Sequence, residues 1–214
     1  RDLRMSRGLG DVYKRQPAQF PRYASGLEKF DGTPLYERQN PAEAIHPFWG
    51  TLLYNYGSPM VKDFLISNAC FWAEVYHADG LRMDDVDAML YLDYGRNPGE
   101  WTPNIYGTNE NLDALEFLKH LNSIVKKQYP GILLIAQEDG LWPQLTDSVE
   151  NDHLGFDYKW SGGWTKDLLS YLEAEPLDRR NYYDQLTLSM MYAYSEHYVC
   201  LLYTSPSPRD MRRS

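Results

Sequence analysis

The spacing of apolar residues predicts two long amphipathic helices, each followed by a buried strand. One helix is expected to start at Ser58-Pro59, and its apolar face at helical spacing consists of Val61, Phe64, Leu65, Trp72, Val75 and Tyr76. The second is expected to start near Asn109, the candidate N-cap, and its face consists of Leu112, Leu115, Leu118, Leu121 and Val125. Strands are expected at 78–84 and 132–136, and "ILLIA" at 132–136 is typical of a strand buried on both faces.

Long irregular segments separate these elements. Residues 17–59 are rich in Pro, Gly and aromatics, and polar, aromatic loops follow both strands. Further helices are expected near 163–174 and 179–194, with a strand starting at 196–199. This order predicts an α/β fold with a parallel sheet. Long loops at the carboxyl ends of the strands favour a (β/α)8 TIM barrel. A doubly wound sheet is the alternative, but no glycine-rich phosphate loop follows either strand.

The two ends of the chain are predicted to be foreign to the fold. "DVYKRQ" (11–16) and "CLLYTS" (200–205) are encoded by one short DNA element read in opposite orientations. That element resembles the transposase adaptor of sequencing libraries. We therefore expect residues 1–16 and 200–214 to be adaptor-derived and residues 17–199 to be the native segment. The alternative is a genuine basic arm and a Ser/Pro tail.

Charge and cysteine content limit the partners of the native segment. Of the 21 basic and 30 acidic residues, the two ends carry 8 and 3, which leaves 13 and 27 and a net charge of −14. Such a surface disfavours nucleic acid and anionic membranes and suits a neutral substrate. Cys70 is the one cysteine within 17–199, so a disulfide framework is not expected, and a cytoplasmic setting fits.

A possible catalytic pair lies at the end of the first predicted strand. Arg82 and Asp84 in "DGLRMDD" are two residues apart, so they face the same side of a strand. A neighbouring guanidinium orients a carboxylate and favours its charged form, and an anionic carboxylate can attack a sugar carbon. A purely structural Arg–Asp pair is the alternative that spacing leaves open.

A set of ordered motifs carries a resemblance to a known family. These are "FDGTPLYE", "LLYNYG", "DGLRMDDVDAMLYLDY", "GEWTPNIYGTNENLDALEFLKHLN", "LGFDYKWSGGW" and "LTLSMMYAYSEHYV". Together they resemble the catalytic domain of bacterial 1,4-α-glucan branching enzymes, within the α-amylase superfamily (glycoside hydrolase family 13). The resemblance implies cleavage of an α-1,4-glucan by a retaining mechanism and transfer of the freed chain to a 6-hydroxyl. It implies that Asp84 is the nucleophile and that Arg82 orients it.

The chain departs from the family pattern where the acid/base is expected. The family's proton-donor Glu aligns with Gln137 in "IAQEDGLWP", and the acid that follows aligns with Glu138. An amide can hydrogen-bond the leaving oxygen but cannot protonate it. If the strand stays regular, Gln137 faces the substrate and Glu138 faces away, and only a bulge would turn Glu138 inward as a substitute. A weakly catalytic subfamily or a sequence error would also account for the glutamine.

Other substrate contacts are predicted from the same resemblance. Gln19 in "AQFP" stands where the family has a His that contacts the sugar. Trp101, Asn104 and Trp142 are further candidates, although most loop aromatics simply pack the loops. No metal site or cofactor is expected, because the histidines lack spaced partners and "DDVDAML" lacks the glycine and closing glutamate of a calcium loop.

The resemblance covers roughly the fourth to sixth barrel strands, so the chain is expected to be a fragment that neither folds nor catalyses alone. The predicted partner is an α-glucan such as glycogen, and the oligomeric state is left open. Three functions remain to be separated. They are a branching transferase, a catalytically impaired glucan-binding homologue, and another hydrolase of the same superfamily.

Overall fold

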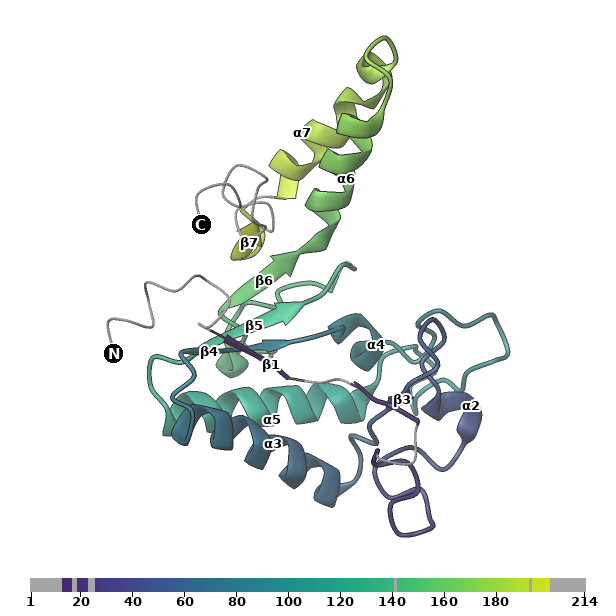
Figure 1. Cartoon of the computed structure of the whole chain (residues 1–214), viewed down its shortest axis with the longest axis vertical. Coiled ribbons are helices and arrows are strands. Elements are labelled where there is room, and N and C mark those ends of the chain that lie inside the picture. Colours follow the sequence, from purple (N-terminus) through teal and green to yellow (C-terminus); the bar gives the residue numbers. More distant parts are fainter. Residues whose placement is uncertain (1–12, 17–18, 23–25, 141, 193, 201–214) are drawn as a thin grey trace, which may run out of the picture.

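We describe the chain from a computed structural model, which covers residues 13–16, 19–22, 26–140, 142–192 and 194–200. Among these residues, five strands form one parallel sheet in the order β1-β4-β5-β6-β7. The strands are β1 (Tyr13–Gln16), β4 (Gly80–Met83), β5 (Leu133–Gln137), β6 (Tyr158–Ser161) and β7 (Tyr198–Cys200). A separate antiparallel pair joins β2 (Gln19–Phe20) to β3 (Leu52–Leu53). The α/β fold with a parallel sheet is therefore confirmed (Figure 1).

Helices connect the strands and cover the sheet. They are α2 (Pro41–Ala44), α3 (Pro59–Glu74), α4 (Val86–Leu90), α5 (Leu112–Gln128), α6 (Gly162–Glu173) and α7 (Tyr183–Tyr192), with 3-10 turns η2 (Val149–Asn151) and η3 (Arg179–Tyr182). Helices α3 and α5 lie side by side against the sheet, whereas α6 and α7 form a hairpin that projects away from it (Figure 1). Because the strands are parallel, the loops that follow them lie at one end of the sheet, and α4 belongs to the loop region after β4.

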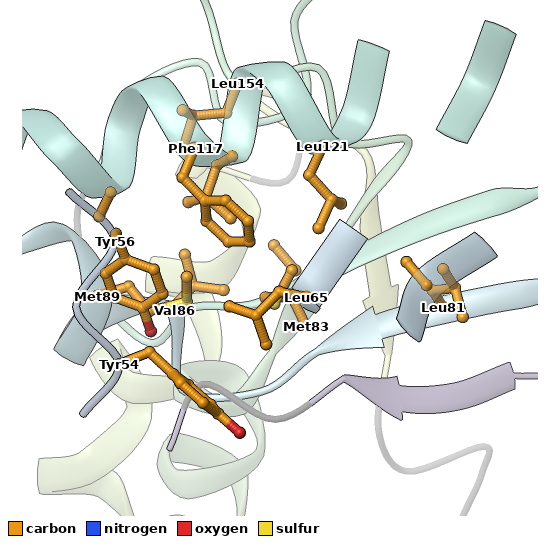
Figure 2. Close-up of a cluster of buried hydrophobic side chains, with 14 of the residues drawn as sticks. Tyr54, Tyr56, Leu65, Leu81, Met83, Val86, Met89, Phe117, Leu121 and Leu154 are labelled. Atoms are coloured by element: carbon orange, nitrogen blue, oxygen red, sulfur yellow. The ribbon is translucent and has the colours of Figure 1, made fainter. Parts of the chain in front are cut away.

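The two faces of the sheet differ in chemistry. Leu81 and Met83 of β4 point into the hydrophobic core with Leu134 of β5, and they meet the buried faces of α3 and α5 there. Figure 2 shows Leu65, Phe117 and Leu121 closing over these strand residues, with Tyr54 and Tyr56 beside them. Alternation along a strand sends the intervening residues, including Arg82 and Ile135, to the opposite face. One register thus separates the helix-covered apolar face from the opposite face. The opposite face also carries Ile135 and Trp160, and we call it the polar face after Arg82 and Gln137.

Several elements were not predicted from the sequence. Helix α2 and strands β2 and β3 lie in residues 17–59, which were expected to form an irregular loop, and β6 and α4 lie in two other expected loops. Strand β6 was expected to be loop, because Lys159 and Ser161 interrupt its apolar pattern. Helix α4 was also expected to be loop, as part of the polar, aromatic segment that follows β4. In the structure its five residues begin after Asp85, whose φ of +55° lies in the left-handed region. Both elements depend on tertiary partners that a local pattern does not reveal.

Details of the predicted helices also needed correction. The N-cap of α5 is Asn111, whose Oδ1 accepts from the Ala114 N–H at 3.4 Å, and not Asn109, whose amide donates to Asp93 instead. Phe64, Val75 and Tyr76 were assigned to the buried face of α3 but are 39%, 55% and 56% exposed. Strand β1 lies in the stretch predicted to be adaptor-derived, and the origin of that stretch stays a prediction.

The core position Leu118 provides a test of the packing. Leu118 on α5 is fully buried, so Leu118→Ala removes packed methyl groups and leaves a cavity. We expect the free energy of unfolding to fall by about 2–5 kcal/mol, measured by urea denaturation of a protein that carries the chain. Leu177→Ala, at a position 89% exposed, is the matched control and should change it by less than about 0.5 kcal/mol. Equal effects at the two positions would contradict this packing.

Candidate active site

The guanidinium of Arg82 holds the carboxylate of Asp84 at the carboxyl end of β4. Arg82 Nη2 donates to Asp84 Oδ1 at 2.8 Å, and both side chains are largely shielded from solvent. The guanidinium also lies 4.9 Å from the ring centroid of Trp160, a favourable cation–π distance. Arg82 is thus fixed from two sides, and Asp84 is held in one orientation at the end of the strand.

Gln137 lies on the same face of the sheet as Arg82. Gln137 is in register with Trp160, whose ring covers the Arg82 guanidinium. Residues in register on neighbouring strands point to the same side, so the face that carries Arg82 also carries the half-buried Gln137. The acid/base position of the family pattern and the candidate nucleophile therefore belong to one polar surface.

Glu138 lies on the opposite side of the strand from Gln137 and pairs with Lys159. Its carboxylate is fully buried and forms an ion pair with the ammonium of Lys159. Lys159 is in register with Ala136, which belongs to the hydrophobic core, so this ion pair lies toward the helices. Burial, followed by the neighbouring Asp87 carboxylate, raises the pKa of Glu138 to about 8, although Lys159 acts in the opposite direction. The substitute acid/base role considered for Glu138 would need this carboxylate to leave its partner.

The loop after β5 is anchored by the same buried charges. Asp87 on α4 accepts from the N–H of Asp139 at 2.8 Å and from that of Gly140 at 3.1 Å. Lys159 Nζ donates to the Gly140 carbonyl at 3.1 Å. A Cβ on Gly140 would lie 2.4 Å from Glu138 Oε1 and 2.7 Å from Asp87 Oδ1, so glycine is required here. Asp87, Glu138 and Lys159, which we call the acid–lysine cluster, thereby fix the chain that follows Gln137.

A second buried carboxylate, Asp85, organises the neighbouring loops. Its Oδ2 accepts from His46 Nε2 at 2.8 Å and from Gln19 Nε2 at 3.3 Å. The hydroxyl of Tyr94 donates to Oδ1 at 3.5 Å, and burial together with the Asp85 charge raises the pKa of Tyr94 to about 12. The other end of the Gln19 amide accepts from the Thr51 hydroxyl. Gln19 is thus brought close to the Asp84-Asp85 segment from a distant part of the sequence.

The remaining predicted site residues are not drawn together in this way. The amide of Asn104 is used within its own loop, where it donates to Thr108 Oγ1 at 2.7 Å and accepts from the Tyr106 N–H at 2.9 Å. Trp142 is half-buried, with its ring 5.5 Å from that of Tyr91. Trp101 is half-buried in a separate loop. Asn104 therefore orders its own loop, and sugar contact by Asn104, Trp101 and Trp142 stays a prediction.

Four residues that organise this region had little signal in the sequence, namely His46, Asp85, Asp87 and Lys159. The available signal was the density of acids in "DDVDAML", which we considered only as a calcium loop. Within the residues that the structure covers, no group of three or more His, Cys, Asp or Glu side chains could hold a metal ion. Over that same part of the chain, no helix is both long and apolar enough to cross a membrane.

These observations define a parallel α/β protein with a carboxylate, its guanidinium partner and a polar amide at the carboxyl ends of two adjacent strands. No family model matches the chain. The chain is 50% identical over 192 residues to "1,4-alpha-glucan branching enzyme GlgB" of Methylococcus capsulatus. Proteins of the same name from Thermobifida fusca and Rubrobacter xylanophilus are 50% and 47% identical over 192 residues.

Each alignment includes 90% of this chain but only 26%, 26% and 27% of the respective relatives. The chain therefore spans about a quarter of the length of the curated relatives it matches. The resemblance to bacterial 1,4-α-glucan branching enzymes that the motifs indicated is confirmed.

The raised pKa of Glu138 predicts a pH dependence of stability. Between about pH 4.5 and pH 8 the folded protein keeps one proton on the neighbouring carboxyl groups of Glu138 and Asp87, which leaves one negative charge beside Lys159, whereas the unfolded chain releases that proton. The free energy of unfolding should therefore fall as pH rises through this window, by at most about 1.4 kcal/mol per pH unit. Glu138→Gln should flatten that slope, as measured by urea denaturation across the window. The exposed Glu116→Gln is the control, and an unchanged slope in Glu138→Gln would refute the assignment.

Proposed function

We propose that the chain is part of the catalytic domain of a 1,4-α-glucan branching enzyme and that its sheet belongs to a (β/α)8 barrel. The similarity over 192 residues to proteins of that name carries this proposal. The ion-paired Asp84 at the carboxyl end of β4 supports it, because active sites of such barrels are built on the loops at that end. In this view β4, β5 and β6 are roughly the fourth to sixth barrel strands, and residues 1–16 and 200–214 are adaptor-derived.

In the proposed reaction Asp84 attacks the anomeric carbon of an α-1,4-linked glucosyl unit. The bond to the leaving oxygen breaks, and a covalent glycosyl-enzyme forms. The 6-hydroxyl of an acceptor glucan then displaces Asp84 and gives its proton to the acid/base group, which creates the α-1,6 branch with retained configuration. Arg82 orients the attacking carboxylate through its 2.8 Å contact. The substrate is a neutral α-glucan, which suits the acidic segment 17–199, and the single cysteine of that segment fits a cytoplasmic location.

A retaining mechanism also needs a second carboxyl group about 5–5.5 Å from the nucleophile to protonate the leaving oxygen. Gln137 occupies the position expected for that group and has no acidic proton to give. This observation favours a second candidate function, a glucan-binding homologue with weak or no catalytic activity. The ion pair between Glu138 and Lys159 supports the second candidate further, because the acid considered as a substitute is held in that pair.

A full-length chimera can separate these two functions. Residues 17–199 would replace the matching segment of the Methylococcus capsulatus relative, which supplies the rest of a complete protein. We expect the chimera with Gln137 to branch amylose slowly and Gln137→Glu to raise the rate by about 10²–10⁴, because general acid catalysis is restored. Newly formed α-1,6 linkages, counted by proton NMR, are the measurement.

The controls identify the acid/base and the reaction class. Asp84→Asn should abolish branching in the Gln137 and the Gln137→Glu chimeras alike. If Gln137→Glu gives no gain and Glu138→Gln removes the existing activity, then Glu138 is the acid/base and our assignment is wrong. Release of reducing ends without new branches would instead indicate a hydrolase of the same superfamily.

A further inference from the structure

A tight turn between α2 and β3 presents two aromatic side chains to solvent. The His46 N–H donates to the Thr51 carbonyl at 2.8 Å, and the Gly50 N–H donates to the His46 carbonyl at 3.0 Å. Gly50 has a φ of +64°, the left-handed region that glycine adopts without strain. Phe48 and Trp49 lie at the tip of this turn and are 67% and 58% exposed. The turn is therefore well ordered by hydrogen bonds although its side chains are uncovered.

The imidazole of His46 forms the base of the turn. Its Nδ1 accepts from the N–H groups of Phe48 and Trp49, both at 3.3 Å, so Nε2 carries the ring proton. Nε2 donates that proton to Asp85 Oδ2 at 2.8 Å, and His46 is only 1% exposed. One buried ring thus ties both aromatic residues to the carboxylate next to Asp84.

The aromatic rings are held from below and open above. The indole of Trp49 stacks on the His46 ring with centroids 4.7 Å apart and planes 9° apart. Phe48 packs edge-to-face on Tyr94 with centroids 5.7 Å apart. A Cβ on Gly95 would lie 2.8 Å from the Phe48 ring, so the glycine at 95 permits this position. The outer face of the Trp49 indole is therefore a fixed, flat apolar surface. We call Trp49 and Phe48 together the Trp49 platform.

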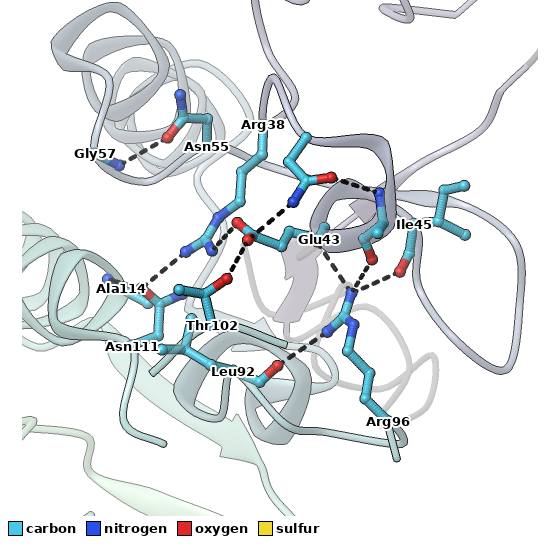
Figure 3. A network of polar contacts seen from close by, with 12 residues as sticks. Arg38, Glu43, Ile45, Asn55, Gly57, Leu92, Arg96, Thr102, Asn111 and Ala114 are labelled. Carbon is cyan, nitrogen blue, oxygen red and sulfur yellow. Dashed lines mark hydrogen bonds and ion pairs between the residues drawn. The ribbon is translucent and has the colours of Figure 1, made fainter. Parts of the chain in front are cut away.

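The end of α2, which precedes the platform in the sequence, is held in place by hydrogen bonds from Arg96. Figure 3 shows the Arg96 guanidinium reaching three carbonyl groups at the end of α2. The distances are 3.2 Å to Ala42, 3.0 Å to Glu43 and 2.9 Å to Ile45, and the other terminal nitrogen donates to the Leu92 carbonyl at 3.2 Å. A surface ordered before a ligand arrives costs little conformational entropy on binding.

We propose that the Trp49 platform binds a glucosyl unit of an α-1,4-glucan chain beside the candidate active site. The inference rests on the proposed function and adds a subsite to it. Pyranose rings present C–H groups whose slight positive charge meets the negative face of an indole. Asp85 links the platform to Gln19 and is the sequence neighbour of Asp84, so a chain lying on Trp49 can continue toward the nucleophile. A glucosyl unit presents a flat, uncharged face, and it therefore matches the exposed, apolar face of the Trp49 ring.

Binding of maltoheptaose to the full-length chimera tests the platform. Gln137 is kept so that the ligand is turned over slowly, and affinity is measured by isothermal titration. We expect Trp49→Ala to weaken binding by about 3- to 10-fold, the order of magnitude of one aromatic stacking contact, while Trp49→Phe keeps most of the affinity. Phe30→Ala, which removes a ring of similar exposure (68%) from another loop, is the matched control and should leave the affinity unchanged.

A fluorine NMR signal from Trp49 itself distinguishes binding at the platform from binding at other sites of the host protein. In chimera labelled with fluorotryptophan, the Trp49 fluorine resonance, assigned by its loss in Trp49→Phe, should shift with maltoheptaose and not with the β-1,4-linked cellohexaose. No shift, together with full affinity in a folded Trp49→Ala, would overturn the platform and leave the proposed function standing. Failure of the unsubstituted chimera to bind maltoheptaose at all would overturn both.

Discussion

A buried ion pair between an ammonium group and a carboxylate is the interaction on which the candidate site depends. Lys159 of β6 pairs with Glu138 at the end of β5, while Asp87 of α4 holds the backbone of the same loop. Removing one member of a buried ion pair typically costs about 3–5 kcal/mol, because the remaining charge is left without compensation. The acid–lysine cluster therefore joins two strands and a helix at the point where the polar face begins.

This constraint decides which side chains the polar face receives. With Glu138 held toward the helices, strand alternation sends Gln137 to the face that carries Arg82 and Trp160. The chemistry available there is then set by residue 137 itself. An amide at this position preserves shape and hydrogen bonding to a sugar oxygen but gives no acidic proton. In the proposed site the sequence thus supplies one carboxyl group, Asp84, where a retaining mechanism needs two.

The loops around the site are ordered by polar contacts to the backbone more than by apolar packing. Arg96 binds three carbonyl groups at the end of α2, and Arg38 bridges Glu43 and Asn111 across the same region (Figure 3). Asp85 collects donors from three separate segments of the chain. Such contacts let long loops hold fixed shapes on a rigid sheet, which is how binding residues are commonly positioned.

The sequence alone determined the elements whose pattern is local. Apolar spacing predicted α3 and α5, the run "ILLIA" predicted β5, and the Arg82–Asp84 spacing predicted their contact on one side of β4. Only the tertiary structure decided β6, where Lys159 is buried because Glu138 comes from another strand. It likewise decided the contacts of Asp85 with His46 and Gln19, which are 39 and 66 residues away along the chain. The periodicity of apolar residues in a sequence shows which face of a helix or strand is buried. A charged side chain, in contrast, can be buried only when folding brings a partner to it from another part of the chain.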